Sequence, residues 1–201
     1  MKVLELDSLI QLDKPLILAS KSPRRVQLLK QIGMDFQVIV SDVVETLENN
    51  RPPKEQAIEL SLAKAQDVAK QVDNGLIIGA DTIVILYEKI LGKPIDFNDA
   101  FSMLKYLSGQ THQVYTGFTI VDSTTANYIS DCECTNVTFR SLTDQEIETY
   151  IHLDSPFDKA GSYGIQDRSA LFVEKIDGCY YNVVGFPLTK FYLRLIDFVN
   201  M

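Results

Sequence analysis

Apolar positions along the chain alternate between short continuous runs and longer stretches in which they recur every three or four residues. The continuous runs predict strands over residues 15–19, 36–40, 76–86, 112–121, 128–140, 171–175 and 180–184. The periodic stretches predict helices over residues 23–32, 53–72, 97–107, 143–153 and 188–199. Strands that alternate with helices are typical of an α/β fold. We expect a mixed sheet, because the two long strands in the middle of the chain are predicted to pair antiparallel.

Capping and turn residues mark where several of these elements begin and end. Ser22 favours a helix start, and Pro23 fits the first helical position. Gly33 is typical of a helix end. Thr143 opens a capping box, which predicts a second well-defined helix start. Residues 155–169 contain glycine and no helical periodicity, so they are predicted to form a loop.

The length and composition of the chain indicate one ordinary globular domain. Its 201 residues are 46% hydrophobic and 23% charged, a balance that excludes wholesale disorder. The chain has no internal repeat, no low-complexity tract and no linker long enough to separate two independent domains. We therefore expect a single domain over residues 1–201, with two lobes around one cleft.

The charge and the cysteines bear on partners and location. A net charge of −8 argues against general binding of nucleic acid, which favours a basic surface. Three cysteines suit no disulfide framework, and reduced thiols of this kind are typical of the cytosol. The first residues carry acids where a signal peptide needs an unbroken apolar run, and no run of about 18 apolar residues occurs. We expect a cytoplasmic protein with neither a membrane nor a nucleic-acid partner.

The segment LILASKSPRR joins a predicted buried strand to the start of a helix. Backbone N–H groups point into the preceding loop there, and Arg24 and Arg25 lie in the first turn, where a cation is locally unfavourable. A bound anion would offset that cost and contact both the N–H groups and the guanidiniums. The stretch from Lys14 to Met34 holds five basic residues and no acidic one. The segment thus predicts an anion site; a capped surface helix with two solvated arginines is the alternative.

Asp81 is a second candidate, because it interrupts the apolar run IIGADTIVI. Burial of an unpaired carboxylate is costly, so Asp81 is expected at a strand end or bulge, or facing a metal or another cation. The alternative is a turn aspartate between two shorter strands. Four further charged residues are each, taken singly, typical of an exposed surface: Glu45, Lys64, Lys93 and Lys159.

Motifs that the chain lacks narrow the chemistry further. It has no G-x-S-x-G elbow, no G-x-G-x-x-G segment, no Walker loop and no H-E-x-x-H pair. With two histidines and three inconspicuous thiols, Ser-His or Cys-His catalysis has little support. The groups that remain are carboxylates, arginines and lysines, which suit magnesium and polyphosphate.

Six segments, in order and at matching spacing, resemble the Maf family of nucleoside triphosphate pyrophosphatases: LILASKSPRR, IIGADTIV, LGKP, LSGQTHQVYTGF, DKAGSYGIQ and VVGFPL. The resemblance runs from Leu16 to about Thr189, and ASxSPRR and DKAGxYGIQ are its most specific pieces. It implies an elongated α/β body with a mixed, twisted sheet flanked by helices, a deep central cleft, and a homodimer. It also implies hydrolysis of a nucleoside triphosphate to the monophosphate and pyrophosphate with a divalent cation, Mg²⁺ or Mn²⁺.

The resemblance assigns individual residues as well. Asp81 corresponds to the family's catalytic acceptor, and Glu45 falls at one of its other charged cleft positions. In the mechanistic hypothesis Asp81 and Glu45 hold the metal, and Asp81 either accepts the proton of the attacking water or serves as a metal ligand only. Arg24, Thr82 and Gln166 correspond to the residues linked to substrate choice. The other expected substrate-binding residues are Ser20, Ser22, Arg25, Lys64 and Lys93.

Arg24, Thr82 and Gln166 together match the branch that acts on dTTP and UTP. Threonine and glutamine side chains donate to and accept from the edge of uracil or thymine, including that of modified pyrimidines. The 7-methyl-GTP branch carries tryptophan in place of the first arginine of SPRR and lacks GADT and GIQ. The hypothesis is metal-assisted attack of water on the α-phosphorus. A 7-methyl-GTP pyrophosphatase, or a non-catalytic nucleotide-sensing inhibitor of septum formation, is the alternative.

Overall fold

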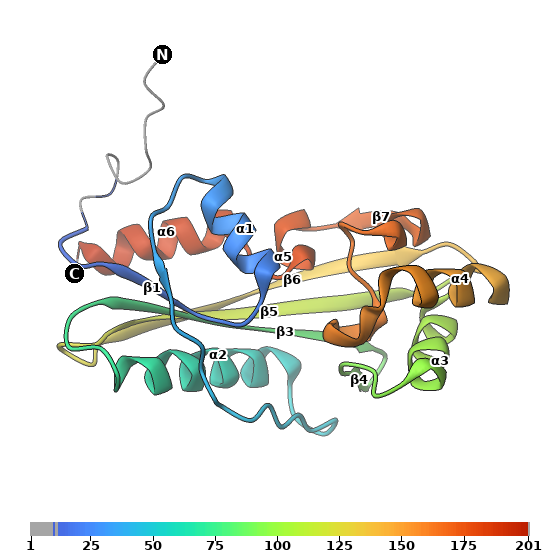
Figure 1. The fold of residues 1–201 in the computed structure, drawn as a ribbon, viewed down its shortest axis with the longest axis horizontal. Coiled ribbons are helices and arrows are strands. Elements are labelled where there is room, and N and C mark those ends of the chain that lie inside the picture. Colours follow the sequence, from blue (N-terminus) through green and yellow to red (C-terminus); the bar gives the residue numbers. More distant parts are fainter. Residues whose placement is uncertain (1–9, 11, 201) are drawn as a thin grey trace, which may run out of the picture.

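A seven-stranded mixed sheet forms the centre of the molecule (Figure 1). The computed structural model describes residue 10 and residues 12–200. The strand order is β2-β1-β3-β5-β6-β7, with β4 paired to β3. β1 pairs parallel with β2 and β3, and the other pairs are antiparallel. The strands are β1 (Leu16–Ala19), β2 (Gln37–Val38), β3 (Leu76–Leu86), β4 (Lys89–Leu91), β5 (Thr111–Asp122), β6 (Tyr128–Phe139) and β7 (Val173–Asp177).

Helices cover both faces and one end of this sheet. α2 lies on one face, α1, α5 and α6 lie on the other, and α3 and α4 pack together at one end of an elongated body (Figure 1). The mixed α/β fold and the antiparallel pairing of the two long strands are therefore confirmed. The helices are α1 (Pro23–Gln31), α2 (Pro53–Ala69), α3 (Phe97–Leu107), α4 (Asp144–Asp154), α5 (Tyr180–Val184) and α6 (Leu188–Val199).

Strand β3 places alternate side chains on opposite faces of the sheet. Ile78 and Val84 belong to the larger core, on the side of α1, α5 and α6, whereas Ile77 packs against α2. Because side chains alternate with a period of two, Asp81 shares the α2 face and Thr82 shares the opposite face. Asp81 and Thr82, neighbours in β3, thus point to opposite faces of the sheet.

The edge of β3 that faces β1 is only partly paired. β1 pairs with residues 76–79, and β4 pairs with residues 84–86. Within the described part of the chain, residues 80–83 have no strand partner on this edge. The opening lies where β1 ends and the chain turns into α1, so it brings the middle of β3 next to the start of a helix.

Several predicted boundaries differ from the structure. The second strand is shorter, α2 ends three residues earlier than expected, and β4 forms where no strand was predicted. The first of the two late strands begins later, and residues 155–169 contain short 3₁₀ turns within the predicted loop. Short elements of this kind depend on their tertiary contacts more than on local propensity.

The strand predicted over residues 180–184 is wrong, because these residues form helix α5. The helix is held by the buried side chain of Asn182, whose Nδ2 donates to Val114 O and Thr135 Oγ1, each at 2.9 Å. It ends at Gly185, whose φ of 122° lies in the left-handed region. These bonds join residues far apart in the sequence, so the local apolar run carried no sign of them.

Two further predictions concern a signal peptide at the start of the chain and segments that could cross a membrane. The expectation that the first residues form no signal peptide falls on residues that lie outside the described part. Among the helices of residues 12–200, none is both long enough and apolar enough to cross a membrane.

Candidate functional site

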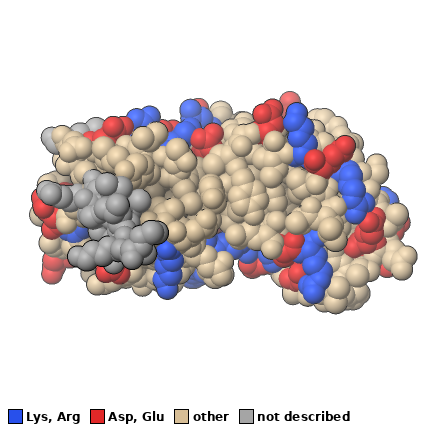
Figure 2. Space-filling model, turned by 90° about the horizontal axis from the view of Figure 1, so that it is seen from above, with Lys and Arg blue, Asp and Glu red and all other residues tan. Residues whose placement is uncertain are grey.

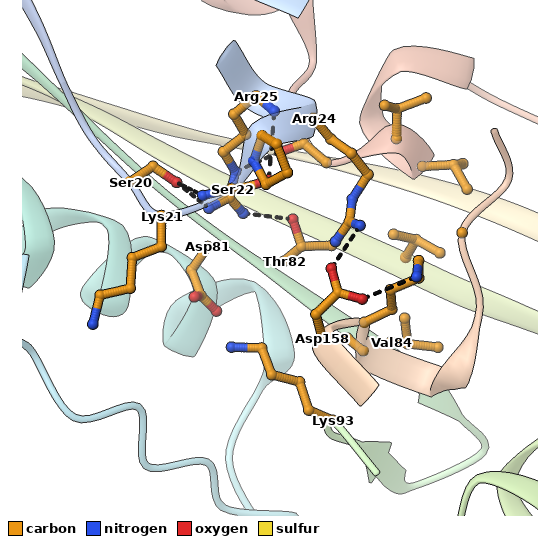
Figure 3. A pocket seen from close by; sticks show the side chains of 18 of the residues that line it. Ser20, Lys21, Ser22, Arg24, Arg25, Asp81, Thr82, Val84, Lys93 and Asp158 are labelled. Carbon is orange, nitrogen blue, oxygen red and sulfur yellow. Dashed lines mark hydrogen bonds and ion pairs between the residues drawn. The ribbon is translucent and has the colours of Figure 1, made fainter. Parts of the chain in front are cut away.

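A pocket of about 400 Å³ opens at the unpaired edge of β3 (Figure 3). Its walls come from the β1–α1 turn, the segment between β2 and α2 that carries Glu45, α2, β3, the loop after β4, the loop over residues 155–169 and the end of α5. Each of the ten residues predicted from the sequence for the site lines this pocket: Ser20, Ser22, Arg24, Arg25, Glu45, Lys64, Asp81, Thr82, Lys93 and Gln166.

Asp81 lies in the pocket at the middle of an unbroken strand and faces a cation. Its Oδ1 accepts a hydrogen bond of 2.5 Å from Lys64 Nζ, on α2. The continuous register of β3 with β5 excludes a bulge, a strand end and the alternative of a turn at this position. Of the placements considered for a buried carboxylate, the structure therefore has the one in which a cation compensates the charge.

Glu45 extends this pair into a chain of alternating charges. Lys64 Nζ also donates to Glu45 Oε1 at 2.7 Å, and Lys93 Nζ donates to Glu45 Oε2 at 2.8 Å. Four residues that looked like isolated surface charges, or like an interruption of a strand, thus form one cluster: Asp81, Lys64, Glu45 and Lys93. The side chains of Lys64 and Asp81 are only 10% and 7% exposed, so bulk water screens their interaction weakly.

The two carboxylates of the cluster differ in basicity. Burial raises the pKa of Asp81, and the nearby Lys64 and Arg25 offset this only in part. Glu45 is also partly buried, but hydrogen bonds from Lys64 and Lys93 outweigh that effect and lower its pKa to about 2. Asp81 is therefore the better proton acceptor, and Glu45 remains an anion.

The start of α1 forms the opposite wall and is capped as the sequence predicts. Ser22 Oγ accepts from the backbone N–H of Arg25 at 3.5 Å, and Pro23 takes the first helical position. In the first turn no acidic residue is present, and the helix start faces the pocket (Figure 3). Backbone dipoles at such a start favour an anion.

The two adjacent arginines point in different directions. Arg25 is buried, and its guanidinium donates to Gly185 O at 2.9 Å, to Ser20 Oγ at 3.3 Å, to Ala80 O at 3.0 Å and to Thr82 Oγ1 at 3.0 Å. Burial lowers its pKa, although nearby Asp81 opposes this. Arg25 thus satisfies the open edge of β3 and ties it to α5, so its donors are occupied by the protein itself.

Arg24, by contrast, extends along the pocket wall. Its Nη1 donates to Asp158 Oδ2 at 2.9 Å, and Lys159 Nζ donates to the other oxygen of Asp158 at 2.9 Å (Figure 3). Arg24 and Arg25 were both expected to contact a bound anion. The structure gives them different roles: Arg25 is structural, and Arg24 faces the cavity. Arg25 is the inward one of the pair, and it meets the backbone oxygen of Gly185 where α1 contacts the end of α5.

The pocket is basic although the chain is acidic. Six basic residues line it against three acidic ones, whereas the whole chain has a net charge of −8. Because screening confines exposed charges to about 8 Å at physiological salt, the distant acids do not cancel this local excess. A pocket with this excess of positive charge attracts a polyanion. The carboxylate of Asp81, whose pKa is raised, would lie beside that polyanion.

The chain matches the family of Maf-like proteins over residues 15–198. It belongs to the Maf family.

Named relatives of this Maf chain agree in what they are said to act on. It is 46% identical over 190 residues to a dTTP/UTP pyrophosphatase of Acetivibrio thermocellus, covering 91% of this chain and 94% of the relative. It is 50% identical over 178 residues to one of Alkaliphilus oremlandii, covering 88% and 92%. It is 48% identical over 191 residues to one of Clostridium botulinum, covering 92% and 97%.

Sequence reasoning missed several residues of the pocket. The sequence alone favours a surface position for Lys159, but its side chain is only 13% exposed and lies between Asp158 and Asp167. No pattern in the residues themselves singles out Asp158 or Tyr163, although both line the pocket. Their signal was present in the segment DKAGSYGIQ, which the Maf resemblance had marked as specific. Tyr163 is fixed from behind by His112, whose Nε2 lies 2.7 Å from Tyr163 Oη.

Two acidic residues of this Maf pocket, Asp81 and Glu45, fit a metal site in which phosphate oxygens of the substrate would complete the ligands. No group of three or more His, Cys, Asp or Glu residues gathers as a ready metal cage among the described residues. Asp81 and Glu45 both approach the ammonium of Lys64, so two carboxylates already converge on one cation. Oxygen ligands from one or two carboxylates, completed by phosphate oxygens, are the set that Mg²⁺ prefers.

Proposed function

We propose that this chain hydrolyses dTTP and UTP to the nucleoside monophosphate and pyrophosphate. The observation that carries the proposal is a buried Asp81 of raised pKa, paired with Lys64, inside a pocket with an excess of positive charge. The names of the relatives from Acetivibrio thermocellus and Alkaliphilus oremlandii support the choice of substrates. Modified pyrimidine nucleotides that keep the same base edge belong to the same class.

Basic groups on both walls would hold the triphosphate. Lys64, on α2, and Lys93, after β4, line the pocket. Arg24 and the start of α1 lie across it from Lys93 (Figure 3). Ser20 and Ser22 border that helix start and offer hydroxyl donors. The carboxylates of Glu45 and Asp158 occupy Lys93 and Arg24 in the free protein, so phosphate oxygens would replace them as partners.

Asp81 is the residue proposed to accept the proton of the attacking water. A carboxyl group whose pKa is raised by burial is more basic than an ordinary aspartate, which favours general base catalysis. Water would attack the α-phosphorus in line with the leaving pyrophosphate. Lys64 and Lys93 would stabilise the negative charge that collects on the leaving group.

Asp81 and Glu45 are also the residues proposed to hold Mg²⁺ or Mn²⁺. A divalent cation held by these two carboxylates would supply positive charge against the negative charge of the phosphates. The low pKa of Glu45, about 2, keeps it ionised and available as a ligand at any pH at which the protein is assayed.

The lining of the pocket favours a neutral pyrimidine over a positively charged purine. Tyr163 is the one aromatic residue among the described residues that line it, and it is only 6% exposed. A 7-methylguanine base carries positive charge and is recognised best by an exposed aromatic face. The intact cluster of Asp81, Lys64 and Lys93 also disfavours a purely nucleotide-sensing inhibitor of septum formation, because sensing alone needs no proton acceptor.

A pyrophosphate-release screen over UTP, dTTP, CTP, GTP and 7-methyl-GTP, each with Mg²⁺ or Mn²⁺, tests the proposal. We expect release from UTP and dTTP and little from the purine nucleotides. Faster release from 7-methyl-GTP would support the second enzyme class instead. Tight binding of nucleotide without any turnover would support the sensing role.

The remaining expectations concern assembly, partners and location. We propose a homodimer, whose mass in light scattering would be twice the 22.7 kDa of one chain. On the face shown in Figure 2, basic side chains alternate with acidic ones toward the margins, and the centre carries neither. This surface offers no continuous basic stripe, which supports the proposal that nucleic acid is not a partner. We propose a cytoplasmic location on the reduced state expected of its three cysteines.

A further inference from the structure

A chain of hydrogen bonds runs behind the wall of the pocket on the Thr82 face of the sheet. Arg25 Nη2 donates to Thr82 Oγ1 at 3.0 Å. Thr82 Oγ1 lies 3.0 Å from Thr116 Oγ1, directly across the β3–β5 pairing. Thr116 Oγ1 donates in turn to the backbone oxygen of Asn182 at 3.1 Å. Four residues from four different elements are therefore connected through two hydroxyl groups.

The two ends of this chain fix the direction of every hydrogen bond in it. A guanidinium can only donate, and a backbone carbonyl can only accept. Thr116 has one hydroxyl hydrogen, and that hydrogen is used on Asn182 O. The bond between the two threonines therefore needs the hydrogen of Thr82, so Thr82 donates to Thr116 and accepts from Arg25.

Burial and the contact of Thr116 with Asn182 keep the direction from reversing. Thr116 and Asn182 are fully buried, so water does not supply an alternative partner for either group. The backbone N–H of Gly185 also donates to Asn182 O at 3.0 Å, but two oxygens 3.1 Å apart repel each other unless a hydrogen lies between them, and in the contact of Thr116 Oγ1 with Asn182 O only Thr116 carries one. Arg25 is held by three further acceptors, so its guanidinium does not rotate away from Thr82. Thr82 itself lines the pocket, and its hydroxyl hydrogen is already committed to the interior. What it offers to a ligand is one remaining oxygen lone pair.

We propose that Thr116 fixes Thr82 as a hydrogen-bond acceptor toward the pocket, and that the site thereby selects a base with an N–H donor at its ring nitrogen. Uracil and thymine carry such a donor at N3, whereas the N3 of cytosine is an acceptor and would meet the lone pair of Thr82. Thr116 is then a positioning residue for specificity. This inference rests on the proposed hydrolysis of dTTP and UTP, which it deepens.

Two methylated substrates test the inference in the wild-type protein. N3-methyl-UTP lacks the N3 donor, and 5-methyl-UTP carries the same added methyl group away from it. We expect kcat/KM for N3-methyl-UTP to be at least about 100-fold below that for 5-methyl-UTP, since sites built around a substrate donor reject analogues that lack it. Similar values for the two substrates would overturn the inference.

Two variants test the part played by Thr116. Thr116→Val keeps the shape but removes the acceptor, which frees the hydrogen of Thr82 to turn toward the pocket. We expect the ratio of kcat/KM for UTP to that for CTP to fall by about 10-fold or more, the effect of about one hydrogen bond. Thr116→Ser keeps a hydroxyl group at this position and is expected to retain the wild-type ratio.

The outcomes separate the inference from the function on which it rests. Turnover of UTP by the wild type with an unchanged UTP-to-CTP ratio in a folded Thr116→Val protein overturns the role of Thr116 alone. Absence of turnover of every triphosphate overturns the proposed function itself. If Thr116→Val does not fold, the comparison of the two methylated substrates still decides whether an N3 donor is read.

Discussion

Asp81 and Glu45 share the ammonium of Lys64 but respond to it in opposite ways. Asp81 is so well buried that desolvation dominates and its pKa rises, whereas Glu45 gains a second lysine and its pKa falls to about 2. Two carboxylates whose environments push their pKa values apart are typical of an acid–base site. The division of labour between a proton acceptor and a permanent anion therefore follows from burial and from the number of lysine partners.

The first prediction concerns Asp81→Asn. We expect turnover of UTP to fall by roughly 100-fold or more, as for the loss of a general base. The folded state is expected to be as stable as the wild type or more so. Because folding raises the pKa of Asp81, its ionised form opposes folding at neutral pH, and Lys64 keeps Glu45 as a partner.

Pyrophosphate release and thermal unfolding, measured on the same samples, check this prediction. Asp73→Asn is the matched control, because Asp73 is exposed and far from the pocket lining. Wild-type turnover in Asp81→Asn would remove Asp81 from the mechanism. A large loss of stability would instead indicate a mainly structural role.

The pH dependence of kcat/KM gives a second prediction for the same residue, because kcat/KM reports the pKa values of the free enzyme. Asp81 accepts a proton only when ionised, so kcat/KM should decline as the pH falls through its raised pKa, above the ordinary value of 3.8. Glu45 stays ionised throughout, because its pKa lies at about 2. Stopped assays between about pH 4 and pH 9, at UTP concentrations below KM, measure this limb. A kcat/KM that stays constant down to pH 4 would contradict the assignment.

At the scale of elements, two glycines bring α2 close to the sheet. A Cβ atom on Gly79 would lie 2.1 Å from the backbone oxygen of Ser61, and one on Gly117 would lie 2.4 Å from the backbone of Ala57. Gly79 shares the α2 face of β3 with Asp81, and Gly117 is the partner of Asp81 in the β3–β5 register. The close approach of α2 is what lets Lys64 reach Asp81.

Gly79→Ala is therefore expected to weaken both the fold and the site. The added methyl group must displace backbone, so we expect a loss of about 1–3 kcal/mol or more in the free energy of unfolding. Displacement of α2 should also lower kcat, because Lys64 moves away from Asp81. Urea unfolding and pyrophosphate release measure the two effects. Gly92→Ala is the control for stability, since nothing lies within 4 Å of its Cβ position; equal stability of the two variants would contradict the packing argument.

Elements with strong local signals could be predicted from the sequence, and those fixed by distant contacts could not. Ser22 and Pro23 mark the start of α1, and the capping box at Thr143 marks α4, because these residues satisfy backbone groups in their own turn. Helix α5 escaped prediction, since it depends on bonds from Asn182 to two strands. The different roles of two adjacent arginines escaped prediction for the same reason.

The residues of the site also fall into those with a local signal in the sequence and those fixed by distant contacts. Asp81 could be found because a carboxylate inside an apolar run needs an explanation. Arg24 and Arg25 could be found because they lie at a capped helix start in a stretch without acidic residues. The Maf resemblance was needed to add Glu45, Lys64 and Lys93 to the site. That Lys64 is the partner of Asp81, 2.5 Å away, depends on how α2 crosses the sheet. No local pattern in residues 53–72 marks one lysine of that helix as different from the others.

At the scale of the whole molecule, a basic pocket lies in an acidic protein. Six basic residues around the pocket act on a triphosphate at short range, while the net charge of −8 acts at longer range. We expect KM for UTP to rise several-fold with added salt, because the screening length falls from about 10 Å at 0.1 M to about 3 Å at 1 M. Initial rates in potassium glutamate and in potassium chloride measure the effect. A KM that falls or stays constant would contradict attraction by the pocket.

The central claim is that this pocket cleaves a pyrimidine triphosphate by attack of water on the α-phosphorus. Hydrolysis of UTP in ¹⁸O-labelled water, with Mg²⁺ present and the products analysed by mass spectrometry, tests it most directly. The account predicts labelled UMP and unlabelled pyrophosphate. Label in pyrophosphate, or UDP and inorganic phosphate as the products, would contradict it.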